Sequence, residues 1–275
     1  MEQTVEVYQI ESDRGALTDP IHVIETQATG LCAIETSSEH IFMGFSGSLA
    51  SQNCVFQVYN YDYEMLKNIT LDIAELNFSD MSLCHDDRFI VCSYTGSIVT
   101  VINLETDEPT IVEDPFGEVE TIWATEIVPF KAEGEPQTVL MPSTRGLFLS
   151  IITEEGQFMY IMESHYPGSN VTNCVIINED EVLCSIQDDE VSKLVILNLD
   201  TKEEKLIIQP ENEIYFLDIV PIPGVSEFFI MHTGRGIQLI DAPHQKTYDL
   251  SLTEQNNFNV FRSLAVQQID QEDPE

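Results

Sequence analysis

One recurring pattern restricts what this chain can fold into. A β-rich apolar run ends in a bulky residue followed by a short polar one. The copies are Tyr8-Gln9, Tyr59-Asn60, Ile102-Asn103, Ile152-Thr153, Leu197-Asn198 and Ile240-Asp241. Successive copies lie roughly 40–50 residues apart, a period typical of repeats that are built from four strands.

A second marker keeps the same period. A short turn, often with glycine, precedes most copies of the first pattern. These turns lie at residues 45–48, 94–97, 144–147 and 234–237, and the fourth copy has the acidic stretch 187–190 in their place. Apolar residues elsewhere alternate with polar ones, as in VEVYQI and IVTVIN, whereas helical periodicity is hard to find. The chain is therefore predicted to be all-β.

Residues 81–115 show the repeat most clearly. Strands are expected over Met81–Cys84, Phe89–Ser93, Ile98–Leu104 and Pro109–Val112, with tight turns between them. Polar and glycine-containing segments separate these short apolar runs, as in antiparallel hairpins.

This stretch resembles the WD-repeat β-propeller family. Asp86-Asp87-Arg88 followed by residues 89–93 is similar to the family's acidic turn and second strand, and residues 96–103 are similar to its third strand. The Trp-Asp dipeptide and the Gly-His pair of the family do not occur, so the resemblance is one of pattern and indicates the wider propeller superfamily. It implies a β-propeller of four-stranded antiparallel blades.

The expected blades span about 30–72, 78–114, 121–163, 171–209 and 214–252. Residues 4–10 and 21–27 are expected as third and fourth strands, and residues 261–269 as the first strand, of a last blade built from both termini. We therefore predict a single domain over 1–269 with six blades, followed by an acidic tail over 270–275. The alternative is an incomplete seven-bladed propeller.

The charge balance narrows the class of partner. Lys plus Arg is 11 and Asp plus Glu is 48, which gives a net charge of −37. Nucleic acid and anionic membranes attract Lys and Arg, so neither is an expected partner. A basic protein partner or cations are favoured. The competing interpretation is that the acid only keeps a large β protein in solution.

The cysteines and the N-terminus indicate a reducing compartment. The cysteines are Cys32, Cys54, Cys84, Cys92, Cys174 and Cys184. None forms a CxxC pair, and most stand in apolar runs, so they are predicted to be small buried core residues rather than disulfides or zinc ligands. The N-terminus has no signal-peptide pattern, and no apolar run reaches the roughly 20 residues of a membrane span. We therefore expect a cytoplasmic protein.

Two arginines are the first candidate binding residues. Arg145 and Arg235 occupy the same turn of two repeats, beside Gly146 and Gly236. The propeller resemblance implies that second-to-third and fourth-to-first connections share one face, which brings both arginines near its centre. Two guanidinium groups there would clamp an acidic or phosphorylated peptide. The competing interpretation is that each arginine pairs with a neighbouring carboxylate.

Aromatic residues are the second set of candidates. Tyr94, Phe116, Tyr166 and Phe258 are expected near that face, where they would form a peptide-contact patch. Packing at sheet edges is the competing interpretation. Trp123 is the only tryptophan and is expected in the core because it stands in the apolar run IWATEIV.

The opposite face is expected to be rich in acid. First-to-second and third-to-fourth turns carry Asp86, Asp87, Glu133, Glu135, Glu179, Asp180, Glu181, Glu105, Asp107, Glu108, Glu154, Glu155, Asp200, Glu203 and Glu204. Such a surface would attract a basic partner. The competing interpretation is that polar turn segments favour acidic residues in any β protein.

Catalytic signatures are missing. No G-x-S-x-G, P-loop or Rossmann glycine pattern occurs, and His85 with Asp86 and Asp87 matches no metal-ligand spacing. We therefore predict a non-enzymatic scaffold for protein or peptide partners, with no cofactor. The alternatives are a propeller enzyme with an asymmetric site at the central channel, and a propeller fragment of a larger multidomain protein.

Overall fold

The computed structural model describes most of the chain up to Leu250. The described residues are 3–7, 10–11, 16–17, 22–26, 28–48, 53–74, 78–113, 121–123, 125–128, 135–161, 163–188, 191–208, 216–222, 225–233, 236–242, 244 and 246–250. All regular secondary structure in these residues is β-strand, as predicted. The chain divides into two compact units, Met1–Phe78 and Ser79–Glu275, called unit 1 and unit 2 below.

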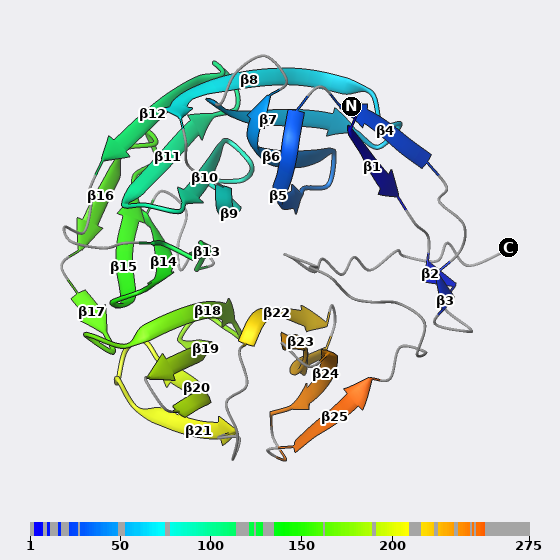
Figure 1. The fold of residues 1–275 in the computed structure, drawn as a ribbon. Coiled ribbons are helices and arrows are strands. Elements are labelled where there is room, and N and C mark those ends of the chain that lie inside the picture. The colour runs from blue at the N-terminus through cyan, green and yellow to red at the C-terminus, as the bar shows by residue number, and fades with distance from the viewer. Residues whose placement is uncertain are drawn as a thin grey trace, which may run out of the picture. The chain divides into compact units, whose positions relative to one another are not determined.

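Near its N-terminus unit 1 contains two strand pairs, which are followed by one four-stranded sheet (Figure 1). Strand β1 (Gln3–Val7) pairs antiparallel with β4 (His22–Thr26), and the short strands β2 (Ile10–Glu11) and β3 (Ala16–Leu17) pair with each other. The sheet follows chain order through β5 (Ala28–Thr36), β6 (His40–Ser48), β7 (Asn53–Asn60) and β8 (Met65–Ala74). The expected strands over 4–10 and 21–27 correspond to β1 and β4.

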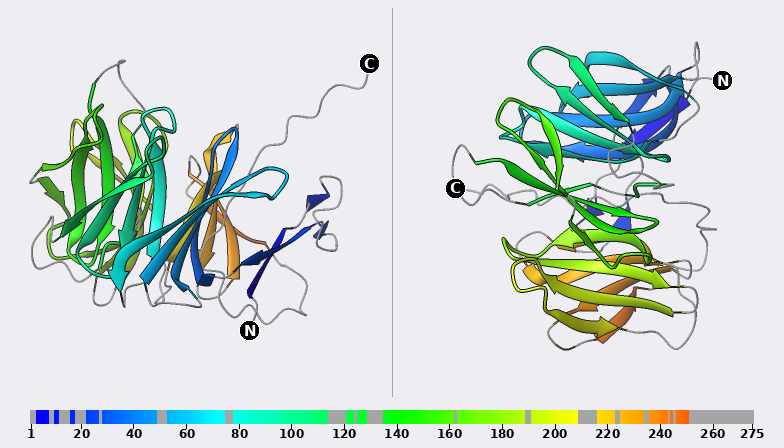
Figure 2. Two further views of the ribbon diagram at one scale, coloured as in Figure 1. Left: turned by 90° about the horizontal axis from the view of Figure 1, so that it is seen from above. Right: turned by 90° about the vertical axis from the view of Figure 1, so that its left-hand side faces the viewer.

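Unit 2 continues with further antiparallel sheets, each formed by strands consecutive in the chain (Figures 1 and 2). The first comprises β9 (Phe78–Cys84), β10 (Phe89–Tyr94), β11 (Ile98–Asn103) and β12 (Glu108–Glu113). The second comprises β13 (Glu126–Ile127), β14 (Gln137–Ser143), β15 (Gly146–Ile152), β16 (Phe158–Ile161) and β17 (Glu163–His165).

The remaining sheets are four-stranded. One comprises β18 (Asn170–Ile176), β19 (Glu181–Asp188), β20 (Val191–Asn198) and β21 (Glu204–Ile208). The other comprises β22 (Phe216–Ile222), β23 (Val225–Thr233), β24 (Gly236–Asp241) and β25 (Lys246–Leu250). Several four-stranded antiparallel sheets in succession are compatible with a propeller-like fold. The strand expected over 261–269 and the acidic tail lie outside the described residues.

The third expected repeat departs from the prediction. A first strand is expected through IWATEIV, but the described residues of this segment contain an isolated bridge at Ile122 and the two-residue strand β13. The fourth strand is divided into β16 and β17, which both pair with β15. Apolar content predicted continuous strands here, whereas the sheet pairs only part of each segment.

The cores of unit 2 lie between successive sheets. Val139 and Met141 of β14 pack with β10 and β11 of the preceding sheet, whereas Leu140 packs with β19 and β20 of the following one. Side chains alternate between the two faces of a strand, so both faces of β14 are covered. Burial of both faces explains the continuous apolar run at residues 139–141 in this strand.

The short polar residue of the repeat closes the turn into the fourth strand. Asn198 Oδ1 accepts hydrogen bonds from the main-chain N–H groups of Asp200 (3.1 Å) and Thr201 (2.8 Å). Side-chain oxygens at the equivalent positions accept from main-chain N–H groups two to four residues further on. These positions are Asn60, Asn103, Thr153 and Asp241. The pattern is therefore a turn-capping device.

Removal of one such cap is expected to weaken unit 2. Asn198→Ala should lower the free energy of unfolding by about 1 kcal/mol, because hydrogen bonds of this kind contribute ~0.5–1.5 kcal/mol each. Urea unfolding measures the change. Asn198→Asp is the matched control, since Asp241 fills the same position in the last described sheet. Equal stability of the alanine variant and the wild type would contradict the assigned role.

Candidate functional site

Arg145 lies in the turn between β14 and β15 and is exposed. Its main-chain N–H donates to Ser143 Oγ at 3.1 Å, and its carbonyl accepts from the N–H of Gly168 at 3.1 Å. Both bonds hold the turn in place at this end of the sheet. Arg235 lies outside the described residues, so the arginine pair stays a prediction.

Tyr166 lies in the connection between the sheets that contain β15 and β18, and it is half-buried. Lys193 Nζ stands 5.8 Å from the centre of its ring. Burial raises the pKa of Tyr166, and the neighbouring Cys184 and Glu204 raise it further. The Gly168–Arg145 hydrogen bond joins this connection to the Arg145 turn, so the structure brings Tyr166 and Arg145 into linked segments.

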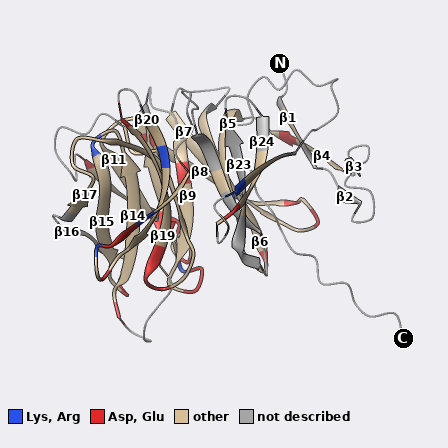
Figure 3. Ribbon diagram, turned by 90° about the horizontal axis from the view of Figure 1, so that it is seen from below, with Lys and Arg blue, Asp and Glu red and all other residues tan. Residues whose placement is uncertain are grey.

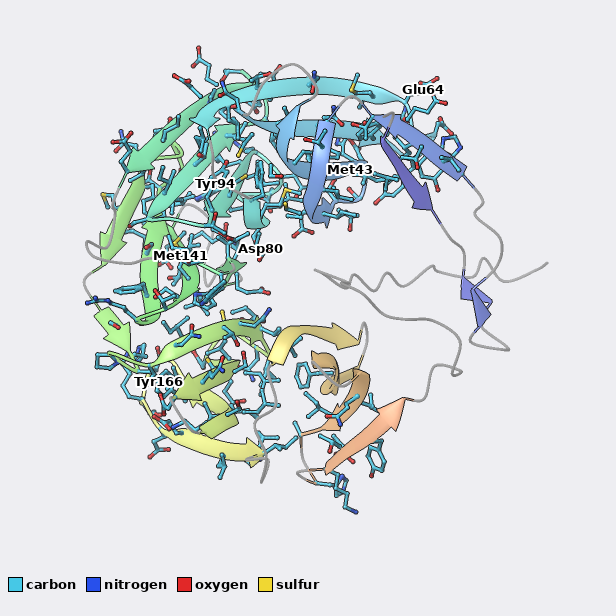
Figure 4. The ribbon with its side chains drawn as sticks, viewed as in Figure 1. Met43, Glu64, Asp80, Tyr94, Met141 and Tyr166 are labelled. Carbon is cyan, nitrogen blue, oxygen red and sulfur yellow. The ribbon has the colours of Figure 1, made fainter. Side chains whose placement is uncertain are left out.

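Tyr94 is not available to a partner. Tyr94 is the last residue of β10, and its side chain is fully buried, with 0% exposure. Figure 4 shows Tyr94 apart from Tyr166. The expectation of a surface contact is therefore corrected, since a side chain without solvent exposure cannot meet a partner. Phe116 and Phe258 lie outside the described residues.

Trp123 is exposed rather than buried in the core. Its exposed fraction is 37%, and its indole N–H donates to Asn170 Oδ1 at 2.7 Å. Its main-chain N–H donates to the carbonyl of Pro142 at 2.8 Å, close to the Arg145 turn. Ile122 beside it is buried, and since both residues are apolar, the sequence alone contains no signal of which one faces outward. The bond to Asn170 therefore fixes the orientation of a partly exposed indole ring.

Acidic turns form a second candidate surface in unit 2. In two of its sheets the first-to-second and third-to-fourth turns touch, because Leu104 N–H donates to Arg88 O (3.0 Å) and Leu199 N–H donates to Asp180 O (2.7 Å). We call the carboxylates of these turns, with those of the β15–β16 turn, the acidic edge; all are exposed except Asp180, which is half-buried. Its members are Asp86, Asp87, Glu105, Asp107, Glu108, Glu154, Glu155, Glu179, Asp180, Asp200, Glu203 and Glu204. Figure 3 colours the Asp and Glu positions of the ribbon red, and several of them lie in turns.

The β9–β10 and β15–β16 turns meet across two sheets. Arg88 Nη1 lies 4.0 Å from Glu154 Oε1, and its guanidinium lies 5.4 Å from the centre of the Phe89 ring. A hydrogen bond with Thr153 and one with main-chain N–H hold the pKa of Glu155 below its usual value, and the Arg88 charge adds to this effect. The Glu155 carboxylate therefore stays ionised to lower pH than an isolated one.

His85 is a structural residue at the same junction. It is buried, and its ring Nε2 lies 3.0 Å from the carbonyl of Ile152 in the adjacent sheet. A carbonyl oxygen only accepts, so Nε2 carries the proton. His85, Asp86 and Asp87 all adopt left-handed φ angles (51°, 52° and 62°), a region in which His and Asp are enriched. The His-Asp-Asp sequence thus fits a tight turn that docks on the next sheet.

Asp241 and His244 form a hydrogen-bonded pair in the β24–β25 turn. His244 Nδ1 lies 2.8 Å from Asp241 Oδ1, and the main-chain N–H of His244 donates to the same oxygen at 3.2 Å. Burial alone would raise the pKa of Asp241, but the His244 bonds and the charges of His244 and Lys246 outweigh it and hold that pKa below its usual value. The main-chain bond and the side-chain bond between His244 and Asp241 therefore stabilise the same turn.

The cysteines are buried and free, as predicted. Burial raises the pKa of both Cys54 and Cys84 to about 12, so these thiols stay protonated and unreactive. Within the part of the chain that the structure describes, no group of three or more His, Cys, Asp or Glu residues is placed to hold a metal ion.

Comparison with known proteins does not assign the chain to a family. No family model matches the chain, and no curated protein matches it. In the residues that the structure describes, no helix is long and apolar enough to cross a membrane.

Proposed function

We propose that this protein is a non-enzymatic interaction module of the β-propeller type, similar in pattern to WD-repeat proteins. Its acidic edge binds a basic segment of a partner protein. The succession of antiparallel sheets with capped third-to-fourth turns supports the architecture. Repeat architectures of this kind commonly present their turns as binding surfaces.

The observation that carries the proposal is the contact between acidic turns. The bonds Leu104–Arg88 and Leu199–Asp180, with the Arg88–Glu154 ion pair, place exposed carboxylates from different turns beside one another. Adjacent like charges raise the local potential and speed the encounter with a cation-rich segment. In the described part of these turns, Arg88 and Lys202 are the basic residues, and they leave the edge strongly negative.

Neutralising three carboxylates of the acidic edge tests the proposal. The variant Asp86→Asn/Asp87→Asn/Asp107→Asn replaces residues with φ between 52° and 62°, a region that asparagine also adopts readily, so the fold should persist. Its affinity for a lysine-rich peptide should fall about tenfold at low salt, because each exposed charge contributes up to ~1 kcal/mol. Titration at increasing salt should reduce the difference between the two proteins.

The matched control removes the same charge elsewhere. Asp72→Asn/Glu113→Gln/Asp188→Asn neutralises three exposed carboxylates that are not part of the acidic edge. It should bind the peptide nearly as well as the wild type. Equal losses in the two variants would show that net charge, and not the edge, governs binding.

A further inference from the structure

The β7–β8 corner of unit 1 concentrates exposed apolar side chains. Among the described residues, Tyr61, Met65 and Leu66 are 38%, 54% and 49% exposed within one short stretch of chain. The exposed large apolar side chains of unit 2 are far apart in the sequence: Trp123, Met159, Leu206 and Tyr248. Clustered aromatic, Met and Leu side chains on a surface are typical of protein-binding sites.

The corner is rigid. Asn60 Oδ1 accepts from the main-chain N–H groups of Asp62 (3.1 Å) and Glu64 (2.8 Å). The Tyr61 hydroxyl donates to the carbonyl of Ser37 at 2.6 Å in the neighbouring turn. Tyr63 stacks on a histidine ring of β4 with the ring centres 4.4 Å apart. Binding to a preformed surface avoids most of the cost of ordering it.

A β-bulge sets the direction of Leu66. Tyr59 pairs with Met65, and the preceding residue of β7, Val58, pairs with Lys67, so Leu66 is the extra residue on β8. Bulges re-aim side chains at sheet edges and are common next to functional sites. Here the bulge leaves Leu66 exposed beside the exposed Met65 rather than packed in the core.

Carboxylates alternate with these apolar residues. Asp62 and Glu64 are exposed, and Figure 4 shows Glu64 at the outer end of the sheet, near the start of β8. An apolar patch between carboxylates is complementary to a segment that carries both apolar and basic side chains. A second copy of this chain is disfavoured, because each copy carries a net charge of −37.

We infer that residues 61–66 are a docking site for a partner segment that combines apolar and basic side chains. The site lies in unit 1 and does not depend on the acidic edge of unit 2. The apolar side chains supply affinity, and the carboxylates select the basic partner and its register.

A short synthetic peptide of alternating leucine and lysine tests the inference on the full chain. Met65→Ser/Leu66→Ser should weaken its binding about tenfold or more, as expected for hot-spot residues. Met159→Ser/Leu206→Ser is the matched control, since both of its residues are 47% exposed, and should leave affinity unchanged. A serine–lysine peptide of equal charge should bind all three proteins equally, because it lacks the apolar side chains.

Several outcomes would overturn the inference. Equal weakening by both double variants would show unspecific adsorption, and no weakening by either would remove the site. As a measurement independent of the variants, NMR signals of residues 61–66 in the wild type should shift when the leucine–lysine peptide is added, and unchanged signals would also remove the site. If the wild type sediments as a dimer and Met65→Ser/Leu66→Ser sediments as a monomer, the corner binds a second copy of this chain instead. These outcomes do not depend on the test of the acidic edge: the proposal for unit 2 can fail while the docking site in unit 1 stands.

Discussion

Replacement of Gly146 by alanine should lower the free energy of unfolding of unit 2 by about 3 kcal/mol. The φ angle of Gly146 is +134°, which L-residues with a Cβ atom rarely adopt. An added Cβ would also stand 2.6 Å from the carbonyl oxygen of His165 and 2.7 Å from Ser164 Oγ. The backbone carbonyl cannot rotate away as a side chain can, so β15 and β17 would have to separate. Urea unfolding measures the loss.

Gly168 offers a control for this experiment. Its φ angle is +87°, but an added Cβ would have nothing within 4 Å. Gly168→Ala should therefore cost only the conformational penalty of about 1 kcal/mol. If both alanine variants lose the same stability, the steric contact at Gly146 contributes nothing.

Replacement of His85 by alanine should also lower the free energy of unfolding by about 3 kcal/mol. The variant leaves the carbonyl of Ile152 without the His85 ring and opens a cavity between two sheets. Alanine also carries a penalty of about 1 kcal/mol at the left-handed φ of residue 85. The main-chain N–H of residue 85 keeps its 2.8 Å bond to Gln137 Oε1, so the turn itself should still form.

The variant His85→Asn separates the two causes of this loss. Asparagine adopts left-handed φ angles readily but cannot fill the space of the imidazole ring. His85→Asn should therefore recover the part of the stability loss that comes from the left-handed φ angle. The part that comes from the cavity should remain, and urea midpoints measure both. Wild-type stability in both variants would show that the ring does not join the sheets.

Several strands could be placed closely from the sequence. The expected strands over 89–93 and 98–104 correspond to β10 (Phe89–Tyr94) and β11 (Ile98–Asn103), because their boundaries are marked by turn residues. Asn103 is one such marker, and its side chain caps the turn that follows β11. These signals are local, so they act before any tertiary contact exists.

The site residues were harder to place. Tyr94 was predicted at the surface and is buried, whereas Trp123 was predicted in the core and is exposed. An aromatic ring is apolar enough for either environment, and its neighbours in the next sheet decide which it receives. The docking role of residues 61–66 also depends on the bulge at Leu66, which arises from the pairing of β7 with β8 and is not visible in either strand alone.

The sequence by itself determined that the chain is all-β and where most strands turn, because alternation and polar turn residues act over a few residues. Tertiary structure alone decided which side chains face solvent and which turns touch. Burial of Tyr94, exposure of Trp123 and the docking of His85 on Ile152 join residues far apart in the chain. Such contacts depend on how one sheet packs on the next, and no local pattern encodes that packing.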